Sequence, residues 1–190
     1  MVNKSCYYIV NGITLYRLMM VPVLIGMVFM YQVDLFKWLL AISFFSDLID
    51  GWLARRYHAT SIIGAKLDSA ADDLTFVAGI VAVVVLKPEF LKQQAVFVII
   101  LVALFLTQTA LAIFRYQKIT SFHTWLAKCA ALMQGTFLIL LFFLPRPVEL
   151  IFYIAFTATA ADLLEEIVLV VLLPEWKANV KGLYWVLKKH

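Results

Sequence analysis

Long runs of hydrophobic residues, separated by short polar segments, divide the chain into six parts. Each run is about 20 residues long or slightly longer, which is the length that an α-helix needs to cross the hydrocarbon layer of a membrane. We expect helices at residues 8–30, 35–55, 67–86, 94–114, 124–144 and 148–173. The pattern therefore predicts an all-α, polytopic membrane protein with six transmembrane helices.

Hydrophobic residues make up 64% of the 190 residues, well above the roughly one-half that is usual in soluble domains. Helices with short connections use nearly the whole chain, so we expect a single domain, residues 1–190, embedded in a lipid bilayer. Nucleic acid is not an expected partner. A short chain without an organelle-targeting segment favours the inner (cytoplasmic) membrane of a bacterium. Trp176, Tyr184 and Trp185 lie among lysines in the tail, as is typical of a segment at the membrane surface.

Positive charge is distributed unevenly between the alternating connections. One side of the membrane receives twelve basic residues, namely Lys4, Arg17, Arg55, Arg56, Lys66, Arg115, Lys118, Lys128, Lys177, Lys181, Lys188 and Lys189. The other side receives four, namely Lys37, Lys87, Lys92 and Arg146. Because basic residues accumulate on the cytoplasmic side of membrane proteins, we expect both termini and the connections after the second and fourth helices to be cytoplasmic.

Five aspartates and two adjacent arginines lie within residues 47–73, across the first of these cytoplasmic connections. Asp47 and Asp50 share one helix face, and Asp68 and Asp72 share another, because residues three or four apart are neighbours on a helix. If the two faces meet, four carboxylates converge, and their charge must be balanced at this depth. Oxygen ligands without sulfur or imidazole suit Mg²⁺ or Mn²⁺. We expect two ions per site, which would clamp a group rich in oxygen, such as a diphosphate.

The residues that follow Asp50 favour the same interpretation. Gly51 and Ala54 are small residues on the aspartate face, where they leave room for a ligand near the helix backbone. A plain helix-packing surface would also explain them. We expect Arg55 to hold a phosphate and Arg56 to anchor the helix at the cytoplasmic surface.

The pattern Asp47-x2-Asp50-Gly51-x2-Ala54-Arg55-x8-Gly64-x3-Asp68-x3-Asp72 resembles the signature of the CDP-alcohol phosphatidyltransferase family at eight fixed positions. The resemblance implies six transmembrane helices, a polar cavity open to the cytoplasm and a homodimer. It also implies a reaction in which an alcohol hydroxyl attacks the phosphatidyl phosphorus of CDP-diacylglycerol and CMP leaves. By resemblance, the metal ligands are Asp47, Asp50, Asp68 and Asp72, the general base is Asp72, and the CDP-lipid is bound by Asp47, Gly51, Ala54, Arg55 and Gly64, with Gly64 at a turn between the helices.

The connection after the fourth helix carries cations that the signature does not explain. Arg115, Lys118 and Lys128 lie around the ends of the fourth and fifth helices. They either set the topology or bind a phosphorylated acceptor. We expect acceptor binding, because Lys128 lies some way into a helix, where an unpaired ammonium is costly. His123 is expected to be structural.

The last predicted helix contains three acidic residues, namely Asp162, Glu165 and Glu166. Acidic residues at membrane depth need a partner. We expect these three to pair with Lys128, Arg115 or Arg17 and to have no role in catalysis.

Glycerol 3-phosphate is the first expectation for the acceptor. Asn11, Thr14 and Arg17 match the offsets found at the start of phosphatidylglycerophosphate synthases and related cardiolipin synthases. Ser69 and Asp73 depart from those enzymes, and the segment DSAAD is closer to phosphatidylserine synthases. Serine, inositol phosphate and other alcohols therefore stay open as acceptors.

Other classes of membrane protein also place aspartates in their helices. A polyprenyl transferase would need two separated motifs and a longer chain, and an ion transporter would show broken helices or repeated halves. An intramembrane aspartyl protease would carry its two aspartates on separate helices. The close spacing of the aspartates here suits metal ions better than any of these, and metal-dependent release of CMP would distinguish the classes.

Overall fold

The computed structural model of the protein describes residues 4–56, 62–118, 120, 122, 124–177 and 180–188. Within these residues all regular secondary structure is helical. The side chains of residues 4–10, 48, 50–55, 62–66 and 69 lie outside the description. The chain divides into two compact units, unit 1 (Met1–Leu91) and unit 2 (Lys92–His190).

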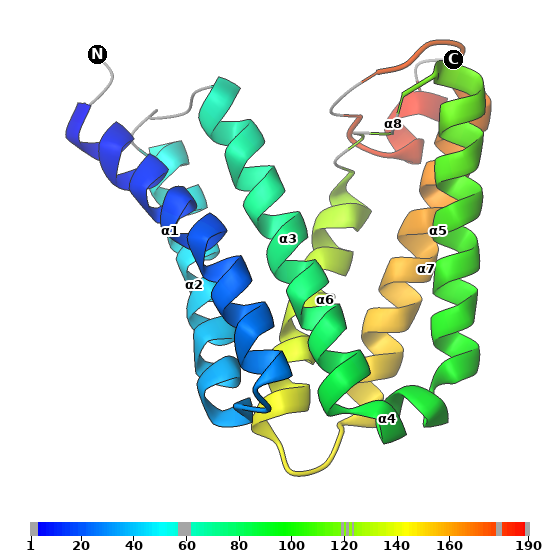
Figure 1. Cartoon of the computed structure of the whole chain (residues 1–190). Helices are drawn as coiled ribbons and strands as arrows, with labels where there is room; N and C mark the ends of the chain where they lie inside the picture. The colour runs from blue at the N-terminus through cyan, green and yellow to red at the C-terminus, as the bar shows by residue number, and fades with distance from the viewer. Residues whose placement is uncertain are drawn as a thin grey trace. The chain divides into compact units, whose positions relative to one another are not determined.

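Unit 1 contains three long helices, namely α1 (Lys4–Phe29), α2 (Val33–Arg56) and α3 (Ile62–Leu86), and the short α4 (Pro88–Gln93) begins near its end. Helix α1 packs against both α2 and α3 (Figure 1). The buried residues of α1 recur at every third or fourth position, namely Thr14, Arg17, Val21, Leu24 and Val28. This spacing places them on one face of the helix, so a single row of side chains meets both neighbours.

On both α2 and α3, the row of buried residues that faces the rest of unit 1 continues into an aspartate. On α2 the row runs through Phe36, Leu40 and Ser43, and Asp47 follows one turn later. On α3 it runs through Ala71, Thr75, Ala78 and Ala82, and Asp68 lies two turns before Thr75. The helical repeat therefore brings acidic side chains from two helices toward the same end of unit 1.

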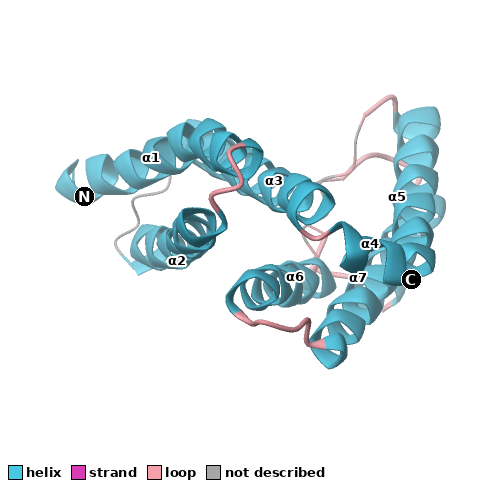
Figure 2. Cartoon of the chain, turned by 60° about the horizontal axis from the view of Figure 1, so that its bottom comes forward, coloured by secondary structure: helices cyan, strands magenta, loops and turns pink. Residues whose placement is uncertain are grey.

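Unit 2 contains α5 (Ala95–Tyr116), α6 (Trp125–Phe143), α7 (Glu149–Leu172) and the short α8 (Leu183–Leu187). Helix α7 packs against both α5 and α6 (Figure 2). Near one end of α5 and α7, the ring centroid of Phe97 lies 5.2 Å from that of Tyr153 and 5.0 Å from that of Phe156. These edge-to-face ring contacts join the two helices.

The C-terminal tail folds onto the other end of unit 2. A buried cluster formed by Ala112, Phe122, Leu169, Val170 and Leu173 packs against Val180, Leu183 and Val186 of the tail. The turn into α8 requires a glycine, because Gly182 has a φ of 145° and a Cβ at this position would lie 3.1 Å from Glu165 Oε1. The tail is therefore part of the packed structure of unit 2.

The six predicted helices are all present, and each end lies within five residues of its predicted position. The short helices α4 and α8 were not predicted. Helix α3 begins at Ile62, so Gly64 lies in its first turn and the prediction of a turn between the helices at this residue is wrong. The three apolar residues Ile62, Ile63 and Leu67 allow the helix to continue back to this point, since neither a proline nor a cap residue interrupts it.

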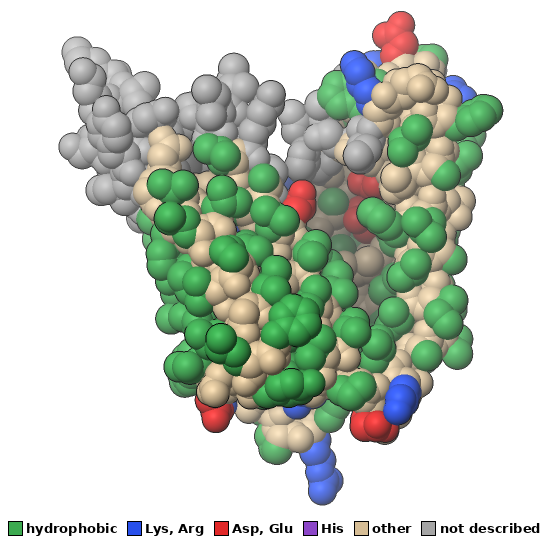
Figure 3. All heavy atoms as spheres, in the orientation of Figure 1, with side chains coloured by type: hydrophobic (Ala, Val, Ile, Leu, Met, Phe, Trp, Pro, Cys, Tyr) green, Lys and Arg blue, Asp and Glu red, His purple; other side chains and the backbone are tan. Residues whose placement is uncertain are grey.

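Three of the helices are long and apolar enough to cross a membrane among the described residues, namely Asn11–Phe29, Ala95–Tyr116 and Trp125–Phe143. The charges of α2 lie toward both of its ends, and α7 carries three acidic residues in its C-terminal half. Hydrophobic side chains cover most of the face shown in Figure 3, as a lipid environment requires. Three of the six predicted spans are therefore candidates for crossing a membrane by their length and composition.

A threonine at the start of α6 provides a test of the packing in unit 2. Thr124 is fully buried, and its hydroxyl accepts a hydrogen bond from the Ala127 amide at 3.0 Å, so it is the N-cap of α6. We expect Thr124→Ala to lower the free energy of unfolding by about 1 kcal/mol. The thermal unfolding midpoint in detergent, followed by circular dichroism, should fall by about 2–4 °C.

The matched control for this substitution is Thr136→Ala on the same helix. Thr136 is exposed, and its hydroxyl donates only to the carbonyl of Leu132 one turn earlier at 2.8 Å. Its removal should leave the midpoint nearly unchanged. Equal shifts in the two variants would contradict a capping role for Thr124.

Candidate functional site

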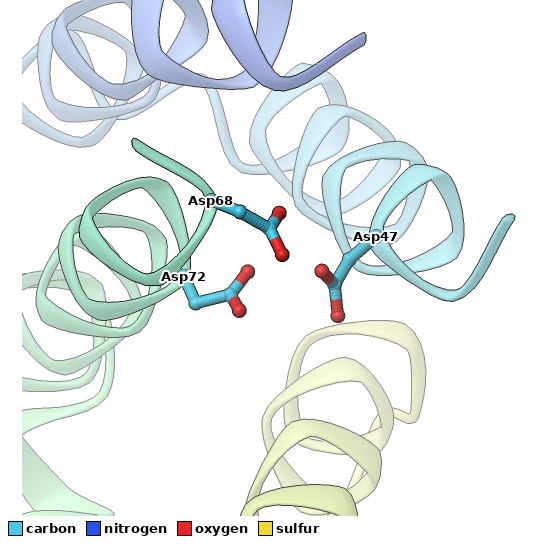
Figure 4. A group of neighbouring side chains, drawn as sticks. All are labelled: Asp47, Asp68 and Asp72. Atoms are coloured by element: carbon cyan, nitrogen blue, oxygen red, sulfur yellow. The ribbon is translucent and has the colours of Figure 1, made fainter. Parts of the chain in front are cut away.

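Three of the four predicted aspartates converge at one point of unit 1. Asp47 comes from α2, and Asp68 and Asp72 come from α3; the three carboxyl groups point toward one another (Figure 4). One oxygen atom from each carboxylate lies within 4.8 Å of the other two. The side chain of Asp50, the fourth predicted ligand, lies outside the described residues.

An arginine from α1 binds all three of these carboxylates. The Nη1 atom of Arg17 donates to Oδ1 of Asp47 at 2.8 Å and to Oδ1 of Asp68 at 3.1 Å. Its Nη2 atom donates to Oδ1 of Asp72. A planar guanidinium with several N–H donors suits such a shared contact. Arg17 thus connects α1 to both α2 and α3.

Sequence reasoning did not identify these partners of Arg17. The expectation was a match to an N-terminal pattern, or a pairing with the acids of the last helix. The useful signal was the position of Arg17 in the row of α1 that also contains Thr14, Val21 and Leu24. A charged residue in a buried row that is otherwise uncharged is expected to face an opposite charge on a neighbouring helix.

The arginine and the carboxylates differ in their access to solvent. The side chain of Arg17 is 1% exposed, whereas those of Asp47, Asp68 and Asp72 are 32%, 36% and 44% exposed. Arg17 therefore closes the cluster on its inner side and leaves the carboxylates open on the other. If all three carboxylates are ionised, their charge of −3 and the +1 of Arg17 leave a net charge of −2.

The donor set fits a divalent cation. All the ligand atoms are carboxylate oxygens, which Mg²⁺ and Mn²⁺ prefer, and the residual charge of the cluster is opposite to that of one such ion. Two ligands of one Mg²⁺ lie at most about 4.2 Å apart, because each bond is about 2.1 Å long. Oxygens within 4.8 Å of one another reach this spacing through small side-chain rotations. The described aspartates can therefore hold a metal ion.

The other residues of the sequence signature lie on the same two helices. Gly51, Ala54 and Arg55 belong to the last turns of α2, after Asp47, and Gly64 belongs to the first turn of α3. Their side-chain environments lie outside the described residues. Arg56, the last residue of α2, is exposed, as the prediction of a surface anchor requires.

The three cations predicted to bind the acceptor all lie in unit 2, and each has a partner of its own. Arg115 Nε donates to the carbonyl of Leu173 at 3.3 Å. The ammonium of Lys118 lies 5.3 Å from the centroid of the Trp176 ring, and that of Lys128 lies 5.1 Å from that of Trp125, the first residue of α6. These three contacts do not bring the cations onto one shared group.

Lys128 is more accessible than the hydropathy pattern indicated. It lies within α6, as predicted, but in the first turn and exposed, so the expected cost of an unpaired ammonium does not arise. An aromatic ring beside an exposed ammonium stabilises it without a carboxylate. His123 lies outside the described residues.

The acids of α7 bind neutral donors, and the predicted pairing with Lys128 or Arg115 is wrong for the described part of the chain. Glu165 Oε1 accepts from the Leu183 amide at 2.8 Å. The hydroxyl of Thr120 donates to Glu166 Oε2 at 3.3 Å, and that of Thr124 donates to Asp162 Oδ1 at 3.4 Å. These bonds attach the segment before α6 and the C-terminal tail to α7, so neutral donors take the place of the expected cations.

The chain matches the model of one protein family, which is described as CDP-alcohol phosphatidyltransferase, over residues 7–172. The match includes all of the aspartates of the cluster and most of both units. No curated protein and no solved structure matches the chain. The family resemblance seen in the aspartate pattern is confirmed, while the family match does not identify the alcohol acceptor.

Removal of one carboxylate tests the metal centre directly. We expect Asp68→Asn to weaken Mn²⁺ binding by about 10–100-fold or more, because an amide carries no charge to balance the ion. The affinity is measured by titrating the EDTA-treated protein in detergent and following free Mn²⁺ by electron paramagnetic resonance.

Asp73→Asn is the matched control for this measurement. Asp73 is adjacent to Asp72 but is exposed and lies outside the described cluster. Its substitution should leave Mn²⁺ affinity within about twofold of the unmodified protein, since an exposed carboxylate that supplies no ligand atom acts on the ion only through water. A loss of the same size in both variants would mean that the ion responds only to total charge.

Proposed function

The chain belongs to the CDP-alcohol phosphatidyltransferase family, and on this basis we propose that it transfers a phosphatidyl group from CDP-diacylglycerol to glycerol 3-phosphate. As a member of this family it is an enzyme of phospholipid biosynthesis and an integral membrane protein. The convergence of Asp47, Asp68 and Asp72 from two helices carries the assignment of the active site.

The metal ligands in this proposal are Asp47, Asp50, Asp68 and Asp72. Two divalent ions, Mg²⁺ or Mn²⁺, would neutralise the diphosphate and the charge that develops on the leaving phosphate. The described carboxylates support this role because they are partly exposed on the side opposite Arg17. Three oxygens held close together by two packed helices supply a preorganised anionic site.

Asp72 is the proposed general base. The acceptor hydroxyl oxygen forms a bond to the phosphatidyl phosphorus, and its proton passes to the Asp72 carboxylate. The bond between this phosphorus and the oxygen of the CMP phosphate breaks, and CMP leaves with the electron pair. Of the three described carboxylates, Asp72 has the most exposed side chain, which favours its contact with a substrate.

The CDP-lipid is proposed to lie along the last turns of α2 and the start of α3. Asp47, Gly51, Ala54, Arg55 and Gly64 are the proposed contacts. The small residues would allow close approach of the nucleotide to the helices, and Arg55 would bind a phosphate. The presence of all five residues on two adjoining helices supports this assignment.

The proposal for the membrane arrangement goes beyond the three candidate spans. We assign six transmembrane helices, cytoplasmic termini and a polar cavity that opens to the cytoplasm, in a homodimer of the bacterial inner membrane. Support comes from the uneven distribution of Lys and Arg among the connections. The single domain, residues 1–190, would comprise both units.

Arg115, Lys118 and Lys128 are proposed to bind the phosphate of the acceptor. All three are exposed at the ends of α5 and α6, so they are available to an anion from the aqueous phase. Their contacts with a carbonyl oxygen and two aromatic rings leave part of each cation open to a second partner.

The reaction is tested by release of CMP from CDP-diacylglycerol and Mg²⁺ in detergent, with glycerol 3-phosphate, serine, inositol, inositol phosphate or water as acceptor. We expect release with glycerol 3-phosphate and none after treatment with EDTA. Release with another acceptor alone would replace glycerol 3-phosphate in the proposal.

The role of Asp72 is tested by the variant Asp72→Asn. It should lower turnover by about 10²–10⁴-fold while CDP-diacylglycerol still binds, because the base is lost. Near-normal turnover in this variant would remove Asp72 from the role of base.

The acceptor assignment is tested by the KM for glycerol 3-phosphate. We expect single alanine variants of Arg115, Lys118 and Lys128 to raise this KM by about tenfold, since each removes a charge-assisted contact. The KM for CDP-diacylglycerol should stay unchanged. Arg146→Ala, which removes an exposed cation between α6 and α7, serves as control. An unchanged acceptor KM in all three variants would contradict the assignment.

A further inference from the structure

The proposed roles of the aspartates do not explain why a buried arginine, Arg17, lies among them in unit 1. A guanidinium that is 1% exposed occupies the inner side of a cluster of carboxylates, and it binds one oxygen of each. The same carboxylates are the proposed ligands of the metal ions. The guanidinium of Arg17 and a metal ion would therefore compete for the same carboxylates.

We propose that Arg17 is a resident counter-cation of the aspartate site, which partly neutralises Asp47, Asp68 and Asp72, holds them together before metal is bound, and lowers the affinity of the site for metal by competing for their oxygens. This inference rests on the proposed metal-binding role of the aspartates. It assigns to Arg17 a positioning role that sets how strongly the enzyme depends on metal concentration.

The geometry supports a holding role before metal is bound. Arg17 Nη1 lies 2.8 Å from Asp47 and 3.1 Å from Asp68, which are on different helices, and Nη2 binds Asp72. Without a positive group, three carboxylates this close would repel one another and separate α2 from α3. One guanidinium satisfies all three at once, which an ammonium with its compact charge does less well.

The geometry also supports competition. A divalent ion bound to these carboxylates would lie near the guanidinium, because Arg17 binds one oxygen of each carboxylate. Like charges at this separation repel strongly where solvent is scarce, and Arg17 is almost completely buried. An arginine guanidinium keeps its proton in proteins, so this repulsion persists. Metal binding must therefore weaken the ion pairs of Arg17.

The test compares Mn²⁺ binding and thermal unfolding of the full-length protein in detergent after treatment with EDTA. We expect Arg17→Met to bind Mn²⁺ about tenfold or more tightly than the unmodified protein, because a competing charge is removed. Without metal, the same variant should unfold at a lower temperature, and Mn²⁺ should raise its unfolding midpoint by more than it raises that of the unmodified protein.

Lys37→Gln is the matched control, because it also removes a cation bound to an aspartate. Lys37 pairs with the exposed Asp34 on α2 at 2.5 Å, outside the cluster. This variant should match the unmodified protein in both Mn²⁺ affinity and unfolding midpoint. If Lys37→Gln binds Mn²⁺ as tightly as Arg17→Met, the effect arises from net charge and the proposal is wrong.

Equal or weaker Mn²⁺ binding by Arg17→Met would overturn the proposal, since the guanidinium would then support the ion. If this variant does not fold, the same Mn²⁺ titration is made with Arg17→Lys. The lysine variant retains a positive charge but reaches fewer oxygens, so it should bind Mn²⁺ more tightly than the unmodified protein. Equal or weaker binding would again overturn the proposal.

Two outcomes separate this proposal from the metal site on which it rests. Absence of Mn²⁺ binding in the unmodified protein would reject the metal site itself. Mn²⁺ binding that is equally strong in the unmodified protein and the Arg17 variants would reject only the role of Arg17.

Discussion

The balance of charge between one arginine and three aspartates connects the helices of unit 1. Each of the three long helices supplies at least one member, namely Arg17 from α1, Asp47 from α2, and Asp68 and Asp72 from α3. Loss of the buried Arg17 would leave three neighbouring carboxylates without compensation, which costs far more than an ordinary surface ion pair contributes. The position of α1 between its two neighbours is thus tied to the same residues that carry the proposed chemistry.

The two groups of acidic residues serve different purposes because their partners differ. In unit 1 the carboxylates face one another, share a single cation and keep a net negative charge. In unit 2 each acid of α7 accepts a hydrogen bond from a separate neutral donor, namely the Leu183 amide and the hydroxyls of Thr120 and Thr124. An excess of negative charge attracts a metal ion, whereas separate neutral bonds attach a loop and a tail. Acidic residues within these apolar helices are therefore not equivalent, and their donors distinguish the two groups.

Much of the fold could be predicted because hydrophobic runs of membrane length leave little choice of secondary structure. Helix ends were less predictable, as Gly64 illustrates, because apolar residues such as Ile62 and Ile63 continue α3 back beyond its predicted start. The partners of individual charges were least predictable. Lys128 was expected to need an acid, yet the ring of Trp125 in the same helical turn stabilises it. Thr124 could have been recognised, since a threonine directly before a long apolar run is a common N-cap.

The sequence by itself determined the class of protein, the helices and the family, because apolar length and the spacing of eight signature residues are local properties of the chain. It also determined that Asp68 and Asp72 share a helix face, since that follows from the helical repeat. Only the tertiary structure decided that Asp47 meets them and that Arg17 is the cation between them. A helical pattern defines which face of a helix is polar, but the packing of α1 against both α2 and α3 selects the opposite charge that this face meets.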